Sequence, residues 1–127
     1  MTNARKRLGA WGESVAATHL EGSGYTIRAR NWRAKVREHG LSGELDIMVQ
    51  KAAHWAFVEV KTRRGGLPEH QLTLRKAHQL MQLALVYLDA HNMSEETDFS
   101  IDLVAVELDR GGKVLRIEHI ENVVVEW

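Results

Sequence analysis

Residues 57–61 read Phe-Val-Glu-Val-Lys, an alternation of apolar and charged side chains that is typical of a β-strand. Because side chains two positions apart lie on the same face of a strand, Glu59 and Lys61 are expected to project together. Val58 and Val60 then point the opposite way, into a core. A charged pair beside a core is costly unless it reaches solvent or serves a purpose. The alternation therefore predicts a strand that carries a polar site on one face.

A second carboxylate lies thirteen residues earlier, in the run Gly43-Glu44-Leu45-Asp46-Ile47. Only a short turn at residues 51–54 separates the two runs, so Asp46 and Glu59 are expected side by side in a hairpin. Two adjacent carboxylates repel each other unless a cation lies between them, and hard oxygen ligands favour Mg²⁺ or Mn²⁺. Such an ion activates a water molecule that a lysine such as Lys61 can position. The pattern predicts a site that cleaves or binds phosphodiesters. The alternative is a surface ion pair with Asp46 capping a turn.

The rest of the chain shows helical and extended patterns in the order α-β-β-β-α-β-β. Apolar residues recur every three or four positions in residues 4–21 and in residues 73–91, where Thr73 is a plausible N-cap. Alternating or β-rich runs predict strands at residues 25–32, 44–50, 55–62, 99–108 and 114–120. This order predicts one α/β domain over residues 1–127, with a central mixed β-sheet flanked by helices.

The faces of two elements can also be predicted. The apolar stripe of the first helix is expected to contain Leu8, Trp11, Val15, Ala16, His19 and Leu20. In the first strand, Tyr25, Ile27 and Ala29 are expected to share one face.

The composition is that of an ordinary globular domain without cysteine. Hydrophobic residues make up 44% of the 127 residues and charged residues 27%. The absence of cysteine excludes a disulfide framework, a thiolate zinc site and a cysteine nucleophile. The N-terminal stretch lacks the apolar segment of a signal peptide, and no run approaches the ~20 apolar residues of a membrane span. We expect a cytoplasmic protein that does not bind a membrane.

The net charge of zero conceals an asymmetry along the chain. Residues 1–88 carry 14 Lys and Arg against 7 Asp and Glu, whereas residues 89–127 carry 3 against 10. Such an asymmetry indicates a polyanion-binding face, although the two halves could also mix in space and cancel. The candidate nucleic-acid contacts are Arg28, Arg30, Arg33, Lys35, Arg37, Arg63, Arg64, Arg75 and Lys76. The alternative for these residues is a solvated strand edge and loops.

The runs around Asp46 and Glu59 resemble the signature of the PD-(D/E)xK nucleases. More narrowly, the chain resembles the YraN-type family of small bacterial proteins, which are related to archaeal Holliday-junction resolvases. Most of the chain takes part in this resemblance, through Gly9-x-x-Gly12-Glu13, Gly24-Tyr25, Asn31-x-Arg33, Arg75-Lys76 and Ile101-Asp102-Leu103-Val104.

The resemblance implies a restriction-endonuclease-like fold and a set of roles. Asp46 and Glu59 would bind the metal ion with the Val60 carbonyl as a third ligand, and Lys61 would be the base that positions water. Glu13 matches an acidic residue that resolvases place beside the metal. The alternative for Glu13 is a solvated glutamate at the start of a helix.

Two positions depart from the family pattern. Leu45 stands where the superfamily has a proline, at a position that carries no chemistry. Ser100 stands where relatives often carry an arginine, and we therefore expect a structural role for Asp102.

Three functions remain open at this point. The first is a metal-dependent endonuclease that hydrolyses phosphodiester bonds of structured, including branched, DNA, using Mg²⁺ or Mn²⁺. A homodimer is expected with it, because resolvases act as symmetric dimers. The second is a nucleic-acid-binding accessory module of a repair or recombination assembly, with little or no cleavage of its own. The third is a protein–protein adaptor that uses the acidic C-terminal half.

Overall fold

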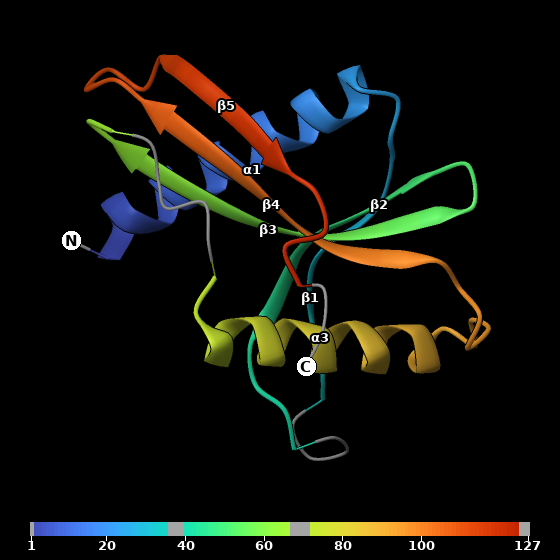
Figure 1. Ribbon diagram of the computed structural model, residues 1–127. Coiled ribbons are helices and arrows are strands. Elements are labelled where there is room, and N and C mark those ends of the chain that lie inside the picture. Colours follow the sequence, from blue (N-terminus) through green and yellow to red (C-terminus); the bar gives the residue numbers. More distant parts are fainter. Residues whose placement is uncertain (1, 36–39, 67–71, 125–127) are drawn as a thin grey trace.

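A five-stranded sheet with a helix on each face makes up the computed structural model, which describes residues 2–35, 40–66 and 72–124 (Figure 1). Its elements are α1 (Thr2–Gly22), β1 (Thr26–Arg33), β2 (Glu44–Lys51), β3 (His54–Arg64), α3 (Leu74–Ala90), β4 (Phe99–Leu108) and β5 (Val114–Ile120). The mixed α/β architecture and the element order confirm the prediction and are consistent with a restriction-endonuclease-like fold. Within the described residues, neither helix has the length and apolar character needed to cross a membrane.

The strands lie in the order of the chain, β1-β2-β3-β4-β5. All neighbours are antiparallel except β3 and β4, which are parallel and are joined through α3. Residues Phe99–Leu108 of β4 are almost entirely buried, because the central part of the sheet is covered on both faces. The site-bearing strand β3 therefore lies at the centre of the sheet, between β2 and β4.

Each helix buries its own apolar core against one face of the sheet. On one side, α3 packs Leu80, Leu83 and Tyr87 against residues that include Phe57 and Ile101. Thr73 is the N-cap of α3 as predicted, since its hydroxyl accepts a hydrogen bond from the backbone N–H of Lys76 at 3.1 Å. On the other side, α1 packs against a core with members from β2, β3 and β4.

The buried face of α1 differs from the predicted stripe. Trp11 is 49% exposed, and the buried positions are Gly12, Ala16, Ala17 and Leu20. These positions still follow helical spacing, but three of the four residues are small. Of the predicted stripe, Ala16 and Leu20 are buried and Leu8 and Val15 pack partly against the same core, whereas Trp11 lies outside it. The small residues Gly12 and Ala17 extend the packed face, because small residues allow a helix to approach a sheet closely.

The predicted face of β1 is correct only up to residue 27. A bulge lies between Ile27, which pairs with Val49, and Ala29, which pairs with Met48. As a result, Ile27 packs on the α1 side and Ala29 on the α3 side, so the expectation that they share a face was wrong. An extra residue in one strand reverses the alternation that follows it.

Asp102 of β4 is 1% exposed and is the centre of a buried polar network. Its carboxylate accepts hydrogen bonds from Ser100 Oγ (2.7 Å), His119 Nε2 (2.8 Å) and the Asn122 backbone N–H (3.0 Å). Burial by itself would raise the pKa of Asp102, but the bonds from His119, Asn122 and Ser100 together hold it below its ordinary value. These bonds tie β4 to β5 and the segment after it, which fits the structural role expected for Asp102.

We expect Asp102→Asn to lower the free energy of unfolding at pH 7 by about 1 kcal/mol, because it removes the charge from these hydrogen bonds. A lowered pKa in the folded state stabilises the protein above the pKa of an unfolded aspartate, about 3.9, and this stabilisation is lost as the pH falls through the folded value. Urea unfolding of both proteins at pH 7 and pH 3 should show a difference that shrinks in acid. Equal stability at pH 7 would contradict the role of the network.

Candidate metal centre

The candidate centre lies where β2 and β3 separate. Their pairing runs from Lys51 and His54 at the turn to Ile47 and Val58, and it stops before Asp46 and Glu59. Beyond this point Asp46 Oδ2 accepts the Val60 backbone N–H at 2.9 Å. A side-chain carboxylate thus takes the place of a backbone carbonyl as the partner of β3. This hydrogen bond holds the Asp46 carboxylate against the strand that carries Glu59.

Asp46 and Glu59 contact each other and are electrostatically coupled. Burial raises the pKa of Asp46 to about 8, and the negative charge of Glu59, a hydrogen bond to Glu59 and the charge of Glu13 act in the same direction. The Val60 N–H opposes this rise. Burial and the neighbouring carboxylates therefore favour the protonated form of Asp46. A cation bound there would relieve the repulsion.

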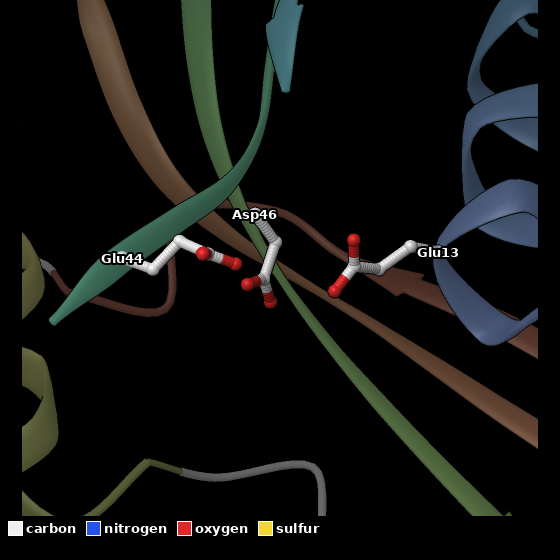
Figure 2. Close-up of side chains that lie close together, drawn as sticks. All are labelled: Glu13, Glu44 and Asp46. Carbon is white, nitrogen blue, oxygen red and sulfur yellow. The ribbon is translucent and has the colours of Figure 1, made fainter. Parts of the chain in front are cut away.

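Glu13, Glu44 and Asp46 form a cluster on the open side of this pair. Each contributes one carboxylate oxygen, and these oxygens all lie within 4.8 Å of one another. Figure 2 shows Glu13 reaching from α1 and Glu44 from β2 toward Asp46, which lies between them. The structure thereby brings together three of the four predicted catalytic residues: Glu13 and Asp46 in this cluster, and Glu59 through its contact with Asp46.

Asn31 of β1 joins the two outer carboxylates. Its Nδ2 donates to Glu13 Oε1 at 2.8 Å and to Glu44 Oε1 at 3.0 Å. The backbone of Asn31 is left-handed, with φ of 55°, a conformation that asparagine tolerates better than most residues. Sequence reasoning assigned no site role to Asn31 or Glu44. The signal for Glu44 was present, because it stands two positions from Asp46 in the same strand.

The position of Glu13 depends on Gly12, the residue before it. Gly12 is buried against β3, and a Cβ at Gly12 would lie 2.8 Å from Thr62 Cβ and would overlap Thr62 Oγ1. Only glycine allows α1 to lie this close to β3. The glutamate that follows is therefore held beside the point where the strands separate, half-buried and within reach of Asn31.

Lys61 and Val60 are the remaining predicted catalytic and metal-binding residues, and both lie on β3. Lys61 is half-buried and follows Glu59 by two positions in the same strand, as expected from the alternation. The N–H and the carbonyl of one strand residue point to the same neighbour, so the Val60 carbonyl lies on the side where Asp46 approaches. This placement is compatible with the expected third ligand.

Two of the basic residues predicted to bind nucleic acid contact the carboxylates. Arg33 Nε lies 3.2 Å from Glu44 Oε2, and Lys76 Nζ lies 3.5 Å from Glu59 Oε2. Arg28 belongs to the other end of β1, where its Nε donates to Gln50 Oε1 at 2.9 Å. The other described candidates are exposed side chains: Arg30, Lys35, Arg63, Arg64 and Arg75. Arg37 lies outside the described residues.

An open cleft of about 490 Å³ adjoins the centre on the α3 side. The cleft lies between residues 40–42 and the first turns of α3. A hydrogen bond from Gln79 Nε2 to the Ser42 carbonyl, at 2.8 Å, connects these two segments. Its lining is polar and basic, with Thr73, Arg75, Lys76, His78, Gln79 and Gln82 from the α3 side. Lys76 therefore borders both the cleft and Glu59.

The carboxylates of the candidate centre lie in the part of the chain that is similar to a known protein family. The model of Uncharacterised protein family UPF0102 matches residues 12–106, which include all the carboxylates described above. A UPF0102 protein of Roseiflexus castenholzii is 40% identical over 129 residues, with 99% of each chain covered. A UPF0102 protein of Chloroflexus aurantiacus is 38% identical over 126 residues, again with 99% of each covered. One of Streptomyces coelicolor is 39% identical over 124 residues, covering 95% of this chain and 91% of the relative.

Proposed function

The chain belongs to the UPF0102 family, which is the YraN type, and we propose that it is a metal-dependent endonuclease acting on structured, including branched, DNA. The observation that carries the proposal is the position of Asp46, held between Glu59 on one side and Glu13 and Glu44 on the other. Half-buried carboxylates that lie this close together repel one another, and a cation bound among them would relieve that repulsion.

The donor set fits a hard divalent ion. The available groups are oxygen atoms alone, those of the carboxylates and of the Val60 carbonyl, which suit Mg²⁺ or Mn²⁺. Asp46 would be the shared ligand, with Glu59 and Val60 on the β3 side and Glu13 and Glu44 on the other. When bound, the ion would polarise a phosphate oxygen and lower the pKa of a bound water.

The residues around the carboxylates would orient the reactants. Lys61, on the same face as Glu59, would position the attacking water. Asn31 keeps Glu13 and Glu44 at a fixed separation through its two hydrogen bonds. The exposed arginines at the end of β3, Arg63 and Arg64, would contact flanking phosphates. We also propose that two copies act together, because a branched substrate has two strands to cut.

The test is a titration of Mn²⁺ and Mg²⁺ against labelled duplex, nicked, flap and four-way-junction DNA. Metal-dependent cutting by the wild type is expected, and the panel identifies the preferred structure. Lys61→Ala should cut about 100-fold more slowly, since it loses the group that positions water. Lys51→Ala, which removes a lysine at the distant β2–β3 turn, should cut like the wild type.

Two other outcomes would reject the proposal. Salt-sensitive DNA binding without cleavage of any structure would support the accessory module instead. Absence of both binding and cleavage would support the protein–protein adaptor. Unchanged cutting by Lys61→Ala would leave an endonuclease but contradict the role given to Lys61.

A further inference from the structure

Lys76 lies between the carboxylates and the cleft. Its ammonium is 3.5 Å from Glu59 Oε2, and its side chain also lines the cleft of about 490 Å³. The Glu59 side chain is 11% exposed and that of Lys76 is 36% exposed, so the lysine covers an almost buried carboxylate while remaining in reach of solvent. Its backbone is held at the start of α3 by the Thr73 cap.

The ion pair places Lys76 in competition with a bound cation. An almost buried carboxylate needs a counter-charge, and in this arrangement the ammonium supplies it to Glu59. A divalent ion at Asp46 and Glu59 would supply the same charge at shorter range. The ammonium would then lie next to positive charge, and its flexible stem would allow it to move away.

We propose that Lys76 is a displaceable counter-ion that passes from Glu59 to a nucleic-acid phosphate when a divalent cation binds. The inference rests on the proposed function and assigns the cleft as the phosphate-binding subsite. The cleft offers His78 and the amides of Gln79 and Gln82 as further donors to a phosphodiester, and Thr73 supplies a hydroxyl. Without the metal ion the subsite lacks one of its cations.

This arrangement couples the two ligands. Metal binding releases Lys76 for the phosphate, and phosphate binding removes Lys76 from the metal ligand, so each ligand increases the affinity for the other by the same factor. A lysine that contributed only to the general positive field would not produce this reciprocity.

The experiment compares Lys76→Ala with Arg75→Ala, which removes an equal charge from the neighbouring position of the same helix. Mn²⁺ affinity is measured by calorimetry without DNA. We expect Lys76→Ala to bind Mn²⁺ about 3- to 10-fold more tightly and Arg75→Ala to change it by less than about 2-fold. Lys76→Gln, which retains much of the stem, should behave like Lys76→Ala.

A second measurement follows binding of a labelled four-way junction with and without Mn²⁺, in the Lys61→Ala background to suppress cleavage. The increase in DNA affinity caused by Mn²⁺ should be lost with Lys76→Ala and retained with Arg75→Ala. Equal effects of the two variants in either measurement would overturn the inference.

Asp46→Ala separates the failure of this inference from that of the proposed function. If Asp46→Ala abolishes Mn²⁺ binding and Lys76→Ala still behaves like Arg75→Ala, only the role of Lys76 is wrong. If the wild type binds no Mn²⁺, or if Asp46→Ala binds it unchanged, the proposed metal centre itself is wrong and the inference falls with it.

Discussion

Replacement of Asp46 by asparagine is expected to slow metal-dependent DNA cleavage by about 1,000-fold or more. Asp46 lies beside both Glu59 and the pair of Glu13 and Glu44, so its removal deprives a bound cation of its shared ligand. Asparagine keeps the shape and can still accept the Val60 N–H. The fold should therefore be retained.

The same substitution should increase stability at alkaline pH in the absence of metal. The pKa of Asp46 is raised from 3.8 to about 8, so the folded protein holds a proton that the unfolded chain has released. Stability from this group consequently falls as the pH rises from about 4 to about 8. Asparagine does not titrate, and at pH 9 we expect Asp46→Asn to be more stable than the wild type by about 1–3 kcal/mol.

Thermal and urea unfolding at pH 5 and pH 9, with and without Mn²⁺, would measure this effect. The advantage of Asp46→Asn should be largest at pH 9 without metal, and Mn²⁺ should stabilise the wild type alone. Asp89→Asn, at an exposed position near the end of α3, is the matched control and should change neither stability nor cleavage. A wild type that is more stable than Asp46→Asn at pH 9 without metal would contradict the geometry described for Asp46.

The second large effect is expected from Gly12→Ala, which should lower the free energy of unfolding by about 2–3 kcal/mol. The added Cβ would overlap Thr62 Oγ1 and approach Thr62 Cβ to 2.8 Å, so α1 must shift away from β3. This shift would carry Glu13 away from Asp46. Cleavage should therefore fall as well, even under conditions where the variant is fully folded.

Gly9→Ala is a matched control in the same helix. A Cβ at Gly9 meets nothing within 4 Å, so this change should stabilise α1 by about 0.5–1 kcal/mol through helix propensity. Adding Thr62→Ala to Gly12→Ala removes Oγ1 and Cγ2 from the contact and should recover part of the lost stability. If Gly9→Ala and Gly12→Ala had the same effect on urea unfolding, the close approach of α1 to β3 would be disproved.

Much of the fold follows from local sequence patterns. Alternation in residues 99–108 and 114–120 and the helical spacing of residues 73–91 predicted elements within one residue of their actual ends. Thr73 was identified as a cap because an N-cap depends on its own backbone and the next turn. The proximity of Asp46 and Glu59 could be predicted for a related reason, since a short hairpin brings its two strands into register.

The additional site residues depended on contacts between distant segments. Asn31 reaches Glu13 and Glu44 from a strand with a bulge at residues 27–29, and its own backbone is left-handed, features that an alternating pattern does not reveal. Glu13 reaches Asp46 because Gly12 lies against Thr62, and Lys76 reaches Glu59 because α3 covers that face of β3.

The sequence alone therefore determined the order of the elements, the mixed α/β fold and the strand motif of Asp46, Glu59 and Lys61. These features arise from periodicity and from hairpin pairing, which act over a few neighbouring residues. Only the tertiary structure decided that Glu44 and Asn31 lie beside Glu13 and Asp46 and that Lys76 lies next to Glu59. Those contacts depend on how closely the helices pack on the sheet, and that distance is set by side-chain volumes on elements far apart in the chain.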